Sequence, residues 1–130
     1  MPFPLITGLY AGLSLLLVLV LAYRGVMVRR ATRTGLGTGG STALEQRIRA
    51  HGNAVEYLPM GLLAIALLEL TGHAGWLVHA LGASLLLGRV LHAWGLSTSA
   101  GTSQGRFLGT LLTWLVFAAM AVLLVWRFFR

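Results

Sequence analysis

Residues Glu45 to Pro59 read EQRIRAHGNAVEYLP, and they lead directly into the apolar run MGLLAIALLEL from Met60 to Leu70. This stretch places arginine, asparagine and glutamate side chains at the start of a segment with the apolar character of a membrane helix. Ionisable groups inside a membrane are costly, and by default they mark a functional site. The stretch therefore predicts a membrane helix with a polar site near its beginning.

The rest of the chain is as apolar as this segment. Its 130 residues are 57% hydrophobic and only 10% charged, with a mean hydropathy of +0.82, whereas charged residues make up about a quarter of a typical globular domain. A membrane helix needs about 20 predominantly apolar residues. We expect an all-α integral membrane protein, a four-helix bundle that forms a single domain over residues 1–130. The expected spans cover about residues 4–28, 46–70, 74–96 and 106–129.

The first apolar run, Leu5 to Ala22, has no basic segment before it and no small-residue cleavage site after it. A secretory signal peptide carries both features. We therefore expect this run to be a retained membrane helix.

The basic residues indicate how the chain crosses the membrane. All ten are arginine, and the net charge is +7. They lie at the ends of apolar runs and inside them, so the sequence lacks the soluble basic face that nucleic-acid binding uses. Cytoplasmic loops are enriched in Lys and Arg, which predicts that the first and third connections are cytoplasmic and that both termini are periplasmic. The first connection and its flanks hold six arginines: Arg24, Arg29, Arg30, Arg33, Arg47 and Arg49.

The chain contains no cysteine, so it has no disulfide and no thiol of its own. Any sulfur chemistry must therefore arrive with a ligand. We also expect no metal site.

A polar stripe is predicted on the second helix. On a helix that advances about 100° per residue, Arg49, Asn53 and Glu56 fall within about 60° of one another. Glu45 lies on the same side one turn earlier, whereas His51 points away. Two interpretations remain open for this stripe. It is either a hydrogen-bond network that fixes helix packing or a binding site for a polar ligand.

The third apolar segment contributes two polar residues of interest. Arg89 lies at a membrane depth comparable with that of Glu56, and an ion pair is the simplest way to bury both charges. We therefore predict a structural ion pair between Glu56 and Arg89. His92 lies one turn later, near the membrane boundary, where it is able to donate to a ligand.

Seven residues of the second segment resemble the ExxxRAxxNxxEYxP signature of the MAPEG family, the membrane-associated proteins in eicosanoid and glutathione metabolism. The arginine-rich first connection and an arginine leading the last helix also resemble that family. The sequence GRVLHAWG from Gly88 to Gly95 is similar to that of the small bacterial members. The signature residues are Glu45, Arg49, Ala50, Asn53, Glu56, Tyr57 and Pro59.

The resemblance implies a homotrimer in a bacterial inner membrane, with glutathione held between neighbouring subunits near the cytoplasmic boundary. Arg49 and one of Arg29 or Arg30 would bind the glutathione carboxylates as charge-assisted donors. Glu56 would bind the ammonium group. The remaining residues implied to contact glutathione are Asn53, Tyr57 and His92.

The resemblance further implies that Arg106 is the catalytic residue. It matches the family arginine that faces the sulfur, where a fixed cation favours the thiolate and lowers the thiol pKa. The expected activity is that of a glutathione-dependent transferase or peroxidase in detoxification, acting on lipophilic electrophiles or hydroperoxides from the membrane lipid. His92 and Leu96 stand where eicosanoid-forming relatives carry tyrosines, so leukotriene synthesis is not expected.

Two other functions remain open. One is a non-catalytic family member that binds a lipid or a thiol. The other is a small proton-coupled exporter in which Glu56 cycles protons.

Overall fold

The computed structural model describes residues 3–130, and within them it contains four α-helices. Each helix is long and apolar enough to cross a membrane. The expected all-α, four-helix fold is confirmed, and the helix ends lie within a few residues of the predicted spans. The helices are α1 (Leu5–Thr32), α2 (Thr42–Leu70), α3 (Gly75–Thr98) and α4 (Gln104–Phe128).

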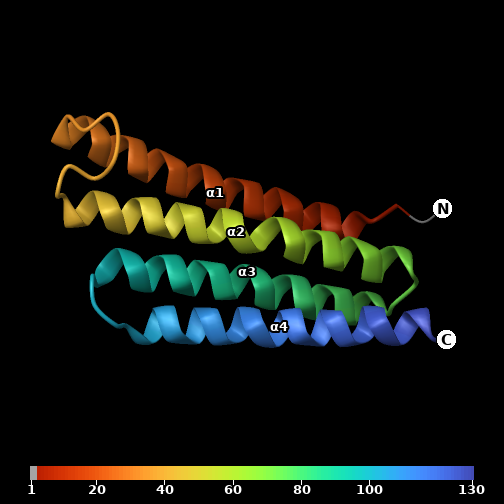
Figure 1. Ribbon diagram of the computed structural model, residues 1–130. Helices are drawn as coiled ribbons and strands as arrows, with labels where there is room; N and C mark the ends of the chain where they lie inside the picture. The colour runs from red at the N-terminus through yellow and green to blue at the C-terminus, as the bar shows by residue number, and fades with distance from the viewer. Residues whose placement is uncertain (1–2) are drawn as a thin grey trace.

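The helices run alternately up and down the bundle (Figure 1). The first and third connections lie at one end, which we call the loop end, and the α2–α3 turn lies at the other end with both chain termini. Neighbours in sequence pack side by side, whereas α1 does not pack against α4. The start of α2, the end of α3 and the start of α4 therefore meet at the loop end.

Serine side chains cap the two helices that begin at the loop end, α2 and α4. The Ser41 hydroxyl accepts a hydrogen bond from the backbone N–H of Leu44 at 3.2 Å, and the Ser103 hydroxyl accepts one from that of Arg106 at 3.3 Å. Each cap satisfies a backbone donor that the first turn of a helix leaves unpaired. The caps fix where α2 and α4 begin, and hence where their first polar residues lie.

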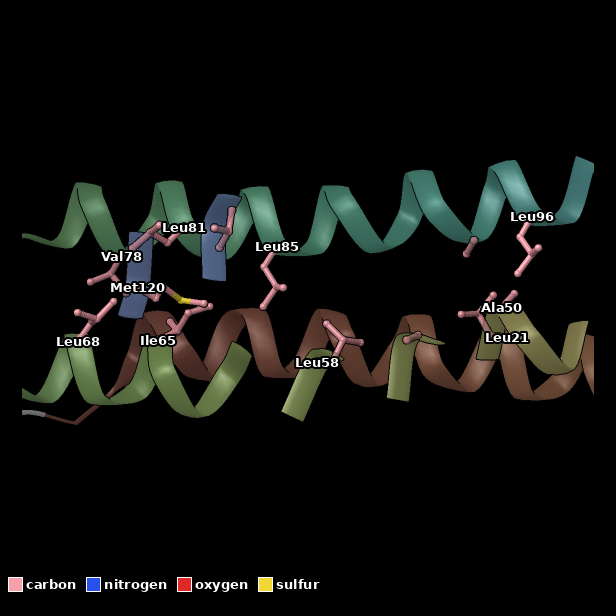
Figure 2. Packing of buried hydrophobic residues seen from close by; sticks show 13 residues of the cluster. Leu21, Ala50, Leu58, Ile65, Leu68, Val78, Leu81, Leu85, Leu96 and Met120 are labelled. Atoms are coloured by element: carbon pink, nitrogen blue, oxygen red, sulfur yellow. The ribbon is translucent and has the colours of Figure 1, made fainter. Parts of the chain in front are cut away.

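The apolar core lies mainly between α2 and α3. Figure 2 shows Leu58 and Ile65 of α2 pointing toward Leu81 and Leu85 of α3, with Met120 of α4 between the two helices near their ends. Many other large apolar side chains are exposed, as expected for a surface that faces lipid. Because lipid is itself apolar, close packing and hydrogen bonds hold such helices together.

Glycines bring α3 and α4 into backbone contact. A Cβ atom added at Gly109 would lie 2.6 Å from the backbone nitrogen of His92, and one added at Gly95 would lie 2.8 Å from the backbone of Gly105. Small residues at helix interfaces permit this close approach. The contact places the His92 end of α3 directly against the start of α4.

Glu69, near the end of α2, holds the beginning of α1. Its carboxylate accepts hydrogen bonds from the backbone N–H groups of Ile6 at 2.9 Å and Thr7 at 2.7 Å, and from the Thr7 hydroxyl at 2.7 Å. The positive end of a helix dipole favours an anion at this place. Sequence reasoning missed this role, because the partners are backbone groups more than sixty positions away.

We expect Glu69→Gln to lower the free energy of unfolding by about 1–2 kcal/mol, as the loss of a helix cap typically does. The amide keeps one acceptor oxygen but loses the charge and the second acceptor. Thermal unfolding in detergent, followed by circular dichroism, measures the change. Glu56→Gln is the matched control, because Glu56 is exposed; equal melting temperatures for the two variants would contradict the capping role.

Candidate functional site

A polar hollow opens at the loop end of the bundle, with a volume of about 350 Å³. Residues from α2, α3, the third connection and α4 line it. Residues more than fifty positions apart in the sequence thus share one site. The lining residues are Thr42, Glu45, Gln46, Arg49, Asn53, His92, Leu96, Ala100 and Arg106.

Helix α2 supplies one wall of the polar hollow. Glu45, Arg49 and Asn53 are spaced four residues apart, so they lie on one face of the helix. Ala50 and Ala54 on α2 are almost fully buried and belong to the apolar core. The polar stripe expected from the sequence therefore lines the hollow as far as Asn53.

Two arginines give the polar hollow its positive charge. Arg49 is exposed, and Arg106 is half-buried at the start of α4. The Arg106 guanidinium donates a hydrogen bond from Nη1 to the carbonyl oxygen of Gly101 at 2.7 Å, which fixes its direction. Neither arginine forms an ion pair or contacts a carboxylate within residues 3–130. Both cations are available to an anionic ligand.

Gln46 ties the two walls of the hollow together. Its side-chain Nε2 donates a hydrogen bond to the backbone oxygen of Leu96 at 3.0 Å, joining α2 to α3. Sequence reasoning missed Gln46 and Thr42 as lining residues. Helical spacing was the available signal: Thr42 lies four residues before Gln46, and Gln46 lies three residues before Arg49, so both lie next to the predicted stripe.

Arg89 is 1% exposed and lies beneath the hollow. Its Nε donates to the Thr113 hydroxyl at 3.0 Å, its Nη2 donates to the Gly109 carbonyl at 3.0 Å, and its Nη1 donates to Oδ1 of Asn53. Its guanidinium carbon also lies 4.6 Å from the centre of the Tyr57 ring, a favourable cation–π distance. Arg89 thus joins α2, α3 and α4.

The predicted ion pair between Glu56 and Arg89 is not formed, and that prediction is corrected here. Glu56 is exposed on the surface of α2, whereas Arg89 is satisfied by neutral oxygens. A guanidinium has five N–H donors, and hydrogen bonds to neutral acceptors meet much of its need without a second buried charge. Similar membrane depth did not mean that the two side chains face each other.

The sequence model of the MAPEG family matches residues 7–126, nearly the whole chain. The chain belongs to the MAPEG family. Its relatives include Inner membrane protein YecN of Escherichia coli strain K12, which is 34% identical over 122 residues, covering 94% of this chain and 92% of YecN. YecN of Escherichia coli O6:H1 strain CFT073 gives the same values. The resemblance inferred from the motif is confirmed.

Part of the MAPEG motif lies outside the polar hollow. The Tyr57 hydroxyl accepts a hydrogen bond from Nε1 of Trp114 at 3.1 Å, and the Tyr57 ring packs edge-on against Phe117. Glu56, the next residue, does not line the hollow. In this MAPEG protein, Tyr57 joins α2 to α4, and Glu56 is exposed.

The two arginines of α1 that the resemblance assigned to glutathione also lie outside the hollow. Arg29 donates from Nη1 to the carbonyl oxygen of Gly37 at 3.0 Å, and over longer distances to those of Thr34 and Gly35. These bonds hold the backbone of the first connection against the end of α1. Arg30 is exposed. The polar hollow of this MAPEG protein therefore brings together Arg49, Asn53, His92 and Arg106, but not Arg29 or Arg30.

We expect Arg89→Ala to lower the free energy of unfolding by about 3 kcal/mol or more, because it leaves a cavity and removes the hydrogen bonds that join three helices. Arg89→Met retains most of the volume and removes the buried charge. It also leaves the acceptor oxygens of Asn53, Gly109 and Thr113 without this donor, so we expect a loss that is smaller than that of Arg89→Ala but still measurable.

Thermal unfolding of both variants in the same detergent separates the stability lost with side-chain volume from the stability lost with the guanidinium group. The Met variant should unfold between the wild type and the Ala variant, because it keeps most of the packing but loses the hydrogen bonds to Asn53, Gly109 and Thr113. An equal loss of stability in the two variants would show that the hydrogen bonds, and not the packing, carry the effect.

Proposed function

We propose that this MAPEG protein is a glutathione-dependent transferase or peroxidase that acts on lipophilic substrates. The observation that carries the proposal is the convergence of Arg49, Asn53 and Arg106 on one hollow whose two arginines have no carboxylate partner in the described chain. Glutathione offers two carboxylates, an ammonium group and a thiol. The hollow, about 350 Å³ in volume, is within the range of small-ligand sites.

The polar groups of the hollow suit the peptide part of glutathione. Arg49 would bind a carboxylate through charge-assisted hydrogen bonds. Asn53 presents both a donor and an acceptor to the peptide, and its Oδ1 is held by Arg89. Glu45 is the carboxylate that lines the hollow of one subunit. His92 lies at the inner wall, where it is able to contact the bound tripeptide.

A homotrimer would bring further groups to this ligand. Arg30 and Glu56 are exposed on one subunit and do not line its own hollow. In the proposed assembly, a neighbouring subunit would supply one of Arg29 or Arg30 to a glutathione carboxylate, and Glu56 would bind the ammonium group. Tyr57 would keep its hydroxyl proton for the peptide, since that hydroxyl only accepts from Trp114.

Arg106 would supply the catalytic effect. Its fixed positive charge stabilises the thiolate of bound glutathione, and the thiolate is the nucleophile. In a transferase step the thiolate sulfur forms a bond to an electrophilic carbon, and the leaving group departs with its electron pair. In a peroxidase step the thiolate sulfur attacks the terminal oxygen of a hydroperoxide, the O–O bond breaks, and an alcohol leaves once its oxygen is protonated, so that glutathione becomes a sulfenic acid. The thiol of a second glutathione then attacks this sulfur, which forms glutathione disulfide and releases the oxygen as water.

Substrates dissolved in the membrane would reach this site from the lipid side, while glutathione would enter from water at the loop end.

We propose that the protein resides in a bacterial inner membrane. The name of the relative YecN and the crowding of arginine around the first connection support this. With the loop end cytoplasmic, both termini are periplasmic.

The test is a titration of the purified, detergent-solubilised protein with glutathione near neutral pH, followed by ultraviolet difference absorption. Thiolate absorbs where thiol does not, so we expect a saturable thiolate signal. Turnover with chlorodinitrobenzene and with cumene hydroperoxide then distinguishes transferase from peroxidase activity. Arg127→Gln, which removes an exposed arginine at the opposite end of the bundle, is the charge-matched control for variants that remove Arg49 or Arg106 from the hollow.

Glutathione binding without a thiolate signal would overturn the catalytic proposal and leave a thiol-binding member of the family. Absence of binding would overturn the glutathione proposal altogether. An exporter that uses Glu56 receives no support from the geometry, because Glu56 lies on the outer surface of the subunit and not in the hollow.

A further inference from the structure

A second hollow lies between α1 and α2 at the loop end, with a volume of about 290 Å³. We call it the α1–α2 hollow. Most of its wall is apolar or small, including Leu21, Ala22, Val26 and Ile48, and the guanidinium of Arg47 lies at its side. It shares no lining residue with the polar hollow.

Arg47 makes no hydrogen bond and no ion pair within residues 3–130, and its Nη1 is buried from solvent. The positive charge of Arg24 also acts on it repulsively. The neighbouring arginines have partners, because Arg24 donates to the Ser97 hydroxyl at 3.3 Å and Arg29 donates to the carbonyl oxygens of the first connection. Arg47 is thus a partly buried cation with one buried N–H group, Nη1, that has no partner within residues 3–130.

Such a cation is costly at a membrane boundary, since burial removes its hydration and no protein group replaces it. The three glutamates of the chain lie elsewhere. Glu69 holds the start of α1, Glu56 is exposed, and Glu45 lines the polar hollow. No glutamate within residues 3–130 therefore pairs with Arg47, which leaves its charge open to an anion from outside the chain.

We propose that the α1–α2 hollow binds an anionic phospholipid, with its phosphate on Arg47 and the upper part of an acyl chain against Leu21, Val26 and Ile48. Phosphate oxygens accept charge-assisted hydrogen bonds from a guanidinium. Basic pockets between membrane helices at the cytoplasmic surface are places where anionic headgroups bind. The mixture of apolar wall and single unsatisfied cation favours a lipid over a soluble anion.

The lipid proposal rests on Arg47, which the proposed glutathione site does not use, although the two proposals have Arg29 in common if Arg29 rather than Arg30 binds glutathione. Arg29 lines the α1–α2 hollow, but its Nη1 is already engaged with backbone oxygens. Arg47 has no role in the proposed binding of glutathione. Removing Arg47 should therefore change lipid binding and leave glutathione binding intact.

Native mass spectrometry of the detergent-purified protein, titrated with phosphatidylglycerol or phosphatidylcholine, tests the proposal. We expect the wild type to retain phosphatidylglycerol preferentially, and Arg47→Gln to bind it about tenfold more weakly, as loss of one charge-assisted hydrogen bond predicts. Arg33→Gln is the matched control, because Arg33 is an exposed arginine at the same end. It should retain the wild-type preference.

A second variant keeps every charge and fills the α1–α2 hollow with a larger side chain. Ala22→Phe places a ring in the α1–α2 hollow, and we expect it to lose phosphatidylglycerol retention while Arg47→Lys largely keeps it. Addition of phosphatidylglycerol should also raise the melting temperature of the wild type, with little effect on Arg47→Gln. These comparisons use stability as well as binding, so a poorly folded variant would be recognised.

Several outcomes would overturn the proposal. An equal loss of phosphatidylglycerol binding in Arg47→Gln and Arg33→Gln would mean that the lipid responds to the overall charge and not to Arg47. Displacement of the lipid by millimolar inorganic phosphate would assign the hollow to a soluble anion. Displacement by glutathione would assign it to the thiol site, and retention of lipid in Ala22→Phe would place the lipid elsewhere.

Discussion

Arg106→Ala is expected to abolish the thiolate absorbance of bound glutathione at neutral pH while the tripeptide still binds. In the wild type, the Arg106 guanidinium is held by the Gly101 carbonyl at the edge of the polar hollow, with its remaining donors available to the sulfur. An unperturbed cysteine thiol has a pKa of about 8.5. Without the cation the bound thiol should return to that range, so little thiolate remains near neutral pH.

The expected fall in turnover is about 10²–10³-fold, the range found when one group that stabilises a developing anion is removed. Because the thiolate is the reactive form, the pH–rate profile of the variant should also shift to higher pH. Absorbance titrations and initial rates with chlorodinitrobenzene, measured across a pH series, give both quantities.

Arg49→Gln is the informative comparison for Arg106→Ala. Both changes remove one positive charge from the polar hollow, but Arg49 is expected to bind a carboxylate. Its loss should weaken glutathione binding and leave the thiolate fraction of the bound ligand near that of the wild type. An undiminished thiolate signal in Arg106→Ala would show that another group ionises the thiol.

Gly109→Ala is expected to lower the free energy of unfolding by about 3 kcal/mol, the upper part of the range for overpacking. The added Cβ would lie 2.6 Å from the backbone nitrogen of His92 and 2.9 Å from its Cα. Backbone atoms are unable to move aside as a side chain does, so α3 and α4 must separate. Separation would also weaken the hydrogen bonds that the Gly109 carbonyl accepts from Arg89 and Thr113.

Gly8→Ala is the matched control for this prediction, since nothing lies within 4 Å of a Cβ added there. In the interior of α1, alanine is the better helix former by about 1 kcal/mol. Thermal unfolding of the two variants in one detergent should therefore show a large loss for Gly109→Ala and little change or a gain for Gly8→Ala. Similar melting temperatures would mean that α3 and α4 tolerate a wider spacing.

The fold was predictable because membrane helices leave a simple signal: long apolar runs separated by short polar connections. The stripe of Glu45, Arg49 and Asn53 was predictable for a similar reason, since it depends only on helical periodicity. The approach of Arg106 to that stripe was different. It depends on how α4 packs against α3, which the sequence indicated only through its resemblance to a family.

The errors have a common physical origin. Glu56 and Arg89 were paired because they lie at similar depth, but depth does not say which way a side chain points around its helix. Neutral acceptors on α4 then satisfied Arg89. Glu69 and Gln46 were missed because their partners are backbone groups of distant segments, and no sequence pattern marks a backbone partner.

The hydrogen bonds of Arg89 connect the side chain of Asn53 on α2 to the backbone and a side chain of α4. One guanidinium holds the amide of Asn53 on α2 together with the Gly109 carbonyl and the Thr113 hydroxyl on α4. A force on Asn53 from a bound ligand is therefore shared by three helices, which resist it as one body. The connection formed by residues 99–103 contributes Ala100 to the wall of the polar hollow, and its Gly101 oxygen holds the Arg106 guanidinium. A change in that connection therefore acts on the shape of the hollow and on the direction of Arg106 together.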